Sequence, residues 1–96
     1  MTDTASIEAC LACAAECEKC AEACLLDGNE YCALLCRDCA DISALCARLQ
    51  ERHSPFAEDF CRLCASVCEA CAAECRQHES CQVCAEACER CAAECR

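Results

Sequence analysis

Cysteine dominates the chemistry available to this chain, which has 19 cysteines among 96 residues. Between Cys61 and Cys75, successive cysteines are separated by steps of three, four, three and four residues. An α-helix has 3.6 residues per turn, so this spacing places all five thiols on one narrow stripe of a helix. Leucine fills such a stripe in an ordinary coiled coil. The sequence therefore predicts a helix whose buried face is made of sulfur.

The same spacing recurs along the chain and divides the cysteines into four stripes. They are Cys10, Cys13, Cys17, Cys20 and Cys24; Cys32, Cys36, Cys39 and Cys46; Cys61, Cys64, Cys68, Cys71 and Cys75; and Cys81, Cys84, Cys88, Cys91 and Cys95. The second stripe has one gap, at Ser43, which lies four residues after Cys39 and three before Cys46. The similar octets CEKCAEAC, CEACAAEC and CERCAAEC indicate an internal repeat. Four such stripes must face one another or a ligand.

The positions of the stripes require four helices, which we expect over residues 4–27, 30–52, 56–77 and 80–96. Alanine, glutamate, leucine and arginine favour helix almost everywhere, and the chain has one glycine and one proline. Gly28 is suited to end the first helix, and Asn29 to cap the second. Ser54 and Pro55 mark the start of the third helix.

The boundary between the third and fourth helices follows from a change in the angular position of the cysteines around the helix. The six residues from Cys75 to Cys81 advance a helix by about 600°, which moves the stripe off its face. This predicts a break around residues 78–80. The fold class is therefore all-α: an antiparallel up-down-up-down four-helix bundle with a Cys-lined core, formed as a single domain over residues 1–96.

Composition also limits the partners and the compartment. The net charge of −10 disfavours nucleic acid, and no apolar run approaches the length of about 20 residues that crosses a bilayer. The cysteines are odd in number and lie within helices, and no signal peptide precedes the first predicted helix. We therefore expect reduced thiols in the cytoplasm, not a secreted disulfide scaffold.

A core of thiols indicates metal binding. Any one cysteine in a helix is most simply a small buried hydrophobe, but alanine or leucine would fill four whole stripes better and without the liability to oxidation. Thiolates select Cu(I), Zn(II) or iron–sulfur clusters. A zinc ion with four thiolates carries two net negative charges, whereas Cu(I) bridged by thiolates, at about one copper per sulfur, leaves the core near neutrality. Continuous rows of thiols do not resemble the loops that wrap iron–sulfur clusters.

The sequence shows no combination of residues typical of an enzyme, since paired catalytic carboxylates, a nucleophile with its base and a phosphate-binding glycine loop are all lacking. The two histidines lie at predicted helix ends. We expect His53 to cap carbonyls or face water, and His78 to be a metal ligand. Copper is predicted to load at the end of the bundle that holds His78, while Pro55, Phe56 and Phe60 cover the other end.

The chain resembles the bacterial copper storage proteins over its whole length. The resemblance rests on CRDCADIS from Cys36, on the corner at Ser54, Pro55 and Phe56, and on the repeated units CAEAC and CAAEC. It implies a homotetramer of bundles, Cu(I) held by thiolates inside each bundle, and a cytosolic location for members without an export signal. The chain departs from the family at Ser43, and its loop around His78 is short and poor in histidine and methionine.

These observations predict cytosolic storage of Cu(I), bound by the 19 cysteines and His78. A copper chaperone or a low-molecular-weight thiol is the expected partner in exchange. Two alternatives remain from the residues alone. One is a thiol-rich helical redox buffer or interaction module, and the other is detoxification of zinc or another soft metal.

Overall fold

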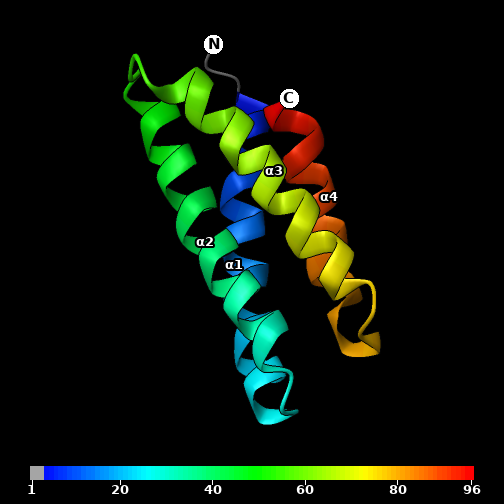
Figure 1. The fold of residues 1–96 in the computed structure, drawn as a ribbon. Helices are drawn as coiled ribbons and strands as arrows, with labels where there is room; N and C mark the ends of the chain where they lie inside the picture. The colour runs from blue at the N-terminus through cyan, green and yellow to red at the C-terminus, as the bar shows by residue number, and fades with distance from the viewer. Residues whose placement is uncertain (1–3) are drawn as a thin grey trace.

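The computed structural model describes residues 4–96, and these form four long helices. They are α1 (Thr4–Leu26), α2 (Glu30–Glu51), α3 (Ala57–Cys75) and α4 (Gln82–Cys95), with the short 3₁₀-helix η1 (Glu79–Cys81) before α4. Within that range there is no strand. The helices run alternately up and down in a bundle 39 Å long and 17 Å across (Figure 1). The structure thus confirms the predicted antiparallel four-helix bundle with a Cys-lined core.

The two ends of the bundle differ, and we name them by what they hold. The start of α1, the end of α4 and the α2–α3 connection lie at the terminal end, and the α1–α2 and α3–α4 connections lie at the hairpin end (Figure 1). None of the helices in the described part of the chain is long and apolar enough to span a membrane.

Two of the connections begin with the same backbone motif. Gly28 has φ 82°, and the Asn29 N–H donates to the Cys24 carbonyl at 2.8 Å. His53 has φ 54°, and the Ser54 N–H donates to the Leu49 carbonyl at 2.9 Å. A left-handed residue followed by such a bond is the Schellman ending of a helix. His53 therefore ends α2 by its backbone conformation.

The start of α3 differs slightly from the prediction. Residues 54–57 form a turn in which the Ala57 N–H donates to the Ser54 carbonyl at 3.1 Å and the Phe56 N–H donates to Ser54 Oγ at 3.1 Å. Because this turn uses Pro55 and Phe56, the helix begins at Ala57, one residue later than expected. Asn29 stands at the N-cap position of α2, as expected, but its side chain makes no capping hydrogen bond.

The predicted break before α4 is confirmed. His78 has extended backbone, with φ −120° and ψ 123°, and one 3₁₀ turn follows it. The Gln82 amide donates to the His78 carbonyl at 2.8 Å, and the Arg76 guanidinium donates to Gln82 Oε1 at 2.7 Å and to Glu89 Oε1 at 2.6 Å. These bonds fix the connection that ends the thiol core at the hairpin end.

The core consists almost entirely of cysteine and alanine. Cysteines from all four helices fill the centre, and buried alanines such as Ala9, Ala40, Ala72 and Ala85 lie among them. Thiols behave as small hydrophobes when buried, so their burial stabilises the bundle in the same way as that of the alanines. Its small side chains let the helices approach closely, which is consistent with the narrow cross-section of the bundle.

Candidate metal centre

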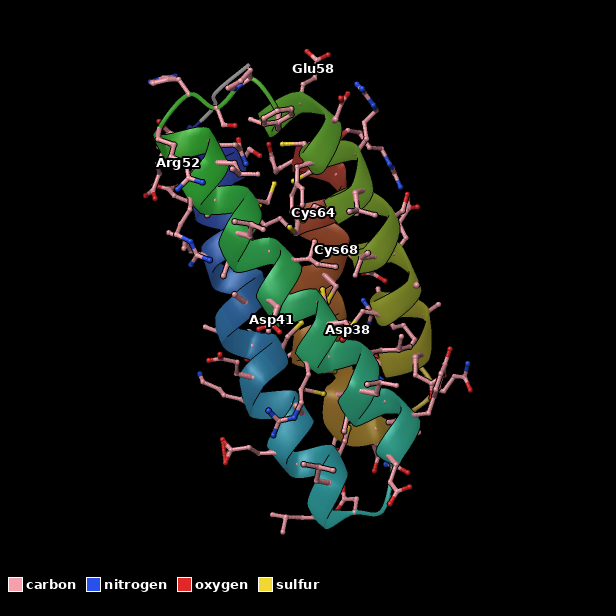
Figure 2. All side chains as sticks on the ribbon, turned by 60° about the vertical axis from the view of Figure 1, so that its left-hand side comes forward. Asp38, Asp41, Arg52, Glu58, Cys64 and Cys68 are labelled. Atoms are coloured by element: carbon pink, nitrogen blue, oxygen red, sulfur yellow. The ribbon has the colours of Figure 1, made fainter. Side chains whose placement is uncertain are left out.

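The bundle brings the predicted cysteines together in one continuous core. Eighteen of the 19 are buried, Cys61 is partly exposed, and all 19 are free thiols. In Figure 2, Cys64 and Cys68 extend from α3 into the space between the helices, whereas Glu58 lies at the surface of the terminal end. The three-and-four spacing thus puts the sulfurs inside the bundle because each helix turns its stripe toward the other three.

Sulfurs from different helices lie as close together as sulfurs on one helix. Along α1, the Cys13 and Cys17 Sγ atoms are 3.9 Å apart. Between helices, the Sγ–Sγ distance is 3.4 Å for Cys24 and Cys81, and 3.5 Å for Cys17 and Cys88. Tetrahedral zinc with Zn–S bonds of about 2.3 Å needs sulfurs about 3.8 Å apart, so sulfur spacing alone does not separate zinc from copper.

The sulfurs also form overlapping groups of four, in each of which all Sγ atoms lie within 4.8 Å of one another. Five of these groups are Cys10, Cys46, Cys64 and Cys95; Cys13, Cys17, Cys39 and Cys88; Cys17, Cys71, Cys84 and Cys88; Cys20, Cys24, Cys32 and Cys81; and Cys20, Cys32, Cys36 and Cys75. Cys17 and Cys88 belong to two groups, as do Cys20 and Cys32. A sulfur shared by two groups can bridge two ions, which is the arrangement that many Cu(I) ions with few sulfurs require.

The surrounding thiols and burial lower the pKa of some cysteines and raise the pKa of others. Hydrogen bonds with Cys17, Cys71 and Cys75 lower the pKa of Cys36 below that of a free thiol, which favours the thiolate form that binds metal. Burial, together with a hydrogen bond between Cys24 and Cys81, raises the pKa of Cys24 to about 11. Filling the core with Cu(I) therefore has to displace protons from sulfurs such as Cys24.

Ser43 lies in the core, as its position in the second stripe predicts. Its side chain is fully buried, and Oγ donates to Cys13 Sγ at 3.6 Å. Oγ also lies 3.7 Å from the sulfurs of both Cys64 and Cys68, and 3.9 Å from Cys39 Sγ. A hydroxyl thus replaces a soft sulfur ligand in the middle of the thiol core.

Two polar core residues were not found by the sequence analysis. Gln50 is fully buried, and its Nε2 donates to Cys46 Sγ at 3.5 Å and to Cys10 Sγ at 3.8 Å. Ser6 is also buried, with Oγ 3.6 Å from Cys95 Sγ. Both could have been found from spacing, because Gln50 follows Cys46 by four residues and Ser6 precedes Cys10 by four.

The histidines occupy different surroundings. His78 lies at the hairpin end, partly buried, with Nε2 2.9 Å from Glu74 Oε2. His53 is exposed at the terminal end. Phe56, expected to cover that end, is 68% exposed and so does not plug the core, while Phe60 is partly buried against it.

Comparison with known proteins gives consistent matches. The family model described as copper storage protein matches residues 2–96. A Bacillus subtilis protein named uncharacterized cysteine-rich protein YhjQ is 44% identical over 79 residues, which are 78% of this chain and 73% of that protein.

Two solved structures have the same fold. The structure described as apo-Csp3, copper storage protein 3 from Bacillus subtilis, has a TM-score of 0.91 and 46% identity, covering 96% of this chain and 93% of the other. The structure described as Cu(I)-bound copper storage protein BsCsp3 has a TM-score of 0.90 and 44% identity, covering 96% and 92%. The chain belongs to the copper storage protein family.

Proposed function

We propose that this member of the copper storage protein family stores Cu(I) inside its helical bundle. The observation that carries the proposal is the continuous core of free thiols, in which the groups of four share sulfurs such as Cys17 and Cys88. A similar protein has been solved with Cu(I) bound, which supports copper as the stored metal. Copper is thus the substance that the protein stores, and the thiol core is its binding site.

Charge favours copper over zinc in this core. About five separate zinc sites, each with four thiolates, would bury on the order of ten negative charges in a bundle whose core is cysteine and alanine. Each Cu(I) that replaces one thiol proton leaves the core charge unchanged. We therefore propose a capacity close to one Cu(I) per cysteine.

The proposed ligands are the 19 cysteines, with His78 as an outer ligand at the hairpin end. His78 suits that role because its imidazole is partly buried in the connection that leads to Cys81. Glu74 Oε2 lies within hydrogen-bonding distance of Nε2, so copper binding through Nε2 requires this contact to break.

We propose further that residues 1–96 act as one domain, that the protein works in the cytoplasm and that it has no catalytic activity. Free thiols throughout the core support a reducing compartment. A copper chaperone or a low-molecular-weight thiol is the proposed exchange partner, because ligand exchange between thiolates keeps Cu(I) bound at each step. A homotetramer is supported by exposed apolar side chains such as Leu26 at 89% and Val83 at 63%.

An anaerobic titration tests the proposed function. Reduced metal-free protein is titrated with Cu(I) in competition with a chromogenic Cu(I) chelator, and in parallel with Zn(II). The expected end point is near 19 copper ions per chain, with zinc displaced by copper. Saturation at four or five ions, or retention of zinc against equal copper, would contradict bridged copper and favour separate tetrahedral sites.

The redox-buffer alternative makes a different prediction. A redox buffer would accumulate disulfides in oxidised glutathione and would emerge free of copper when purified from copper-supplemented cells. Storage predicts copper-loaded protein from those cells, with its thiols protected from alkylation. Metal analysis of the purified protein separates the two functions.

A further inference from the structure

The thiol core ends differently at the two ends of the bundle. At the hairpin end, cysteines extend to the ends of all four helices. Cys24 lies in the last turn of α1, Cys32 in the first turn of α2, Cys75 ends α3, and Cys81 directly precedes α4. None of the four α-helices in the described chain continues its stripe beyond these sulfurs.

At the terminal end, the stripes continue past the last cysteine with other residues. Ser6 lies one step beyond Cys10 on α1, Gln50 one step beyond Cys46 on α2, and Ala57 precedes Cys61 on α3. All three are buried, with exposures of 3%, 0% and 6%. On three helices the core therefore ends in a layer that has no sulfur, and Gln50 is the largest side chain of this layer.

Gln50 does more than occupy space in that layer. Both of its Nε2 contacts are with sulfurs on different helices, Cys10 on α1 and Cys46 on α2. The amide donates to sulfur lone pairs, and copper would otherwise use those lone pairs to extend the array. Cys10 and Cys46 belong to the same group of four, with Cys64 and Cys95.

We propose that the Gln50 side chain closes the thiol core at the terminal end by filling its last layer, and that the stored copper array does not extend past the sulfurs of Cys10 and Cys46 on its own side of that layer. The statement about the copper array rests on the proposed function, whereas the closure of the thiol core does not. Cys61 lies at the edge of the core beside this layer: it is partly exposed, and its sulfur is 3.5 Å from Cys46 Sγ. Gln50 acts as a positioning residue, because it donates hydrogen bonds to two ligand sulfurs and does not bind copper itself.

Labelling of thiols in the reduced, metal-free protein tests the closure without copper. Brief exposure to iodoacetamide, followed by peptide mass mapping, gives a rate for each cysteine. In the wild-type chain, Cys61 should react fast, and Cys10 and Cys46 slowly. In Gln50→Ala the cavity admits reagent, so Cys10 and Cys46 should react about tenfold faster. Cys24 and Cys81, at the other end, should keep their wild-type rates.

The variant Gln50→Met shows whether faster labelling in Gln50→Ala comes from the lost side-chain volume or from loss of the fold. Methionine has nearly the same size, so Cys10 and Cys46 should remain slow in this variant. If Cys24 and Cys81 accelerate as much as Cys10 in Gln50→Ala, that variant has lost its fold and Gln50→Met decides. Wild-type rates at Cys10 and Cys46 in Gln50→Ala would overturn the closure, as would fast labelling of them in Gln50→Met.

A second measurement tests the end of the array. Gln50→Cys places a thiol beside Cys10 and Cys46, and the copper count by native mass spectrometry should rise by one. A wild-type count in Gln50→Cys would show that the array does not end there. If the wild-type protein itself bound few copper ions, the proposed function would fail while the labelling result still stood.

Discussion

Replacing Ser43 by cysteine should add one copper ion to the capacity of the bundle. Ser43 Oγ is fully buried, and four sulfurs lie within 4 Å of it: Cys13 at 3.6 Å, Cys64 and Cys68 at 3.7 Å, and Cys39 at 3.9 Å. A thiolate at this position would complete the stripe on α2 and bridge ions on both sides. At about one ion per sulfur, the capacity rises from about 19 to about 20.

The substitution should leave the metal-free fold almost unchanged. It removes one buried hydroxyl donor, worth about 1 kcal/mol, and gains a similar amount from the more apolar thiol. We therefore expect the free energy of unfolding to change by no more than about 1 kcal/mol. Native mass spectrometry of the copper-saturated protein measures the capacity, because it resolves single bound ions.

Two control variants make this result interpretable. Ser43→Ala also removes the hydroxyl but adds no sulfur, so its capacity should equal that of the wild type. Ser66→Cys adds a thiol at an exposed position of α3, where the hydroxyl donates to the Arg62 carbonyl at 3.3 Å. This variant should gain no copper that resists a chelator. Equal counts for Ser43→Cys and wild type, or an equal gain in Ser66→Cys, would refute the reasoning.

The remaining predictions concern folding, pH and copper uptake. The metal-free reduced protein should give a strongly helical circular dichroism spectrum, because buried thiols already form the core, and a coil spectrum that becomes helical only with copper would contradict this. The free energy of unfolding of the metal-free protein should be fully retained below about pH 9 and fall toward pH 11. Burial raises the pKa of Cys24 to about 11, so the thiol of the unfolded chain loses its proton at a lower pH than that of the folded chain, and rising pH favours unfolding. Urea denaturation at pH 8 and pH 10.5 measures the difference. His78→Ala should slow copper loading severalfold at an unchanged end point, whereas His53→Ala should change neither, and identical kinetics for the two variants would argue against uptake at the hairpin end.

The sequence by itself determined the helices and the inward direction of the cysteines. Both depend on local properties: a three-and-four spacing repeats the turn of the helix, and Gly28 can take the left-handed conformation that ends α1. The phase change between Cys75 and Cys81 likewise predicted the break at His78 from the geometry of one helix. Even Ser43 could be placed in the core from its spacing to its neighbours.

Only the tertiary structure decided which sulfurs meet and where the core closes. Cys24 and Cys81 are 57 residues apart in the chain, and their sulfurs are 3.4 Å apart. This contact depends on how far α1 and α4 are shifted along the bundle axis relative to each other, which the spacing within one helix cannot predict. The same holds for Gln50, whose two sulfur contacts lie on different helices. Phe56 was expected to cover the terminal end, but it lies in the turn before α3 and is exposed, whereas Gln50, which local spacing did not single out, is fully buried at that end.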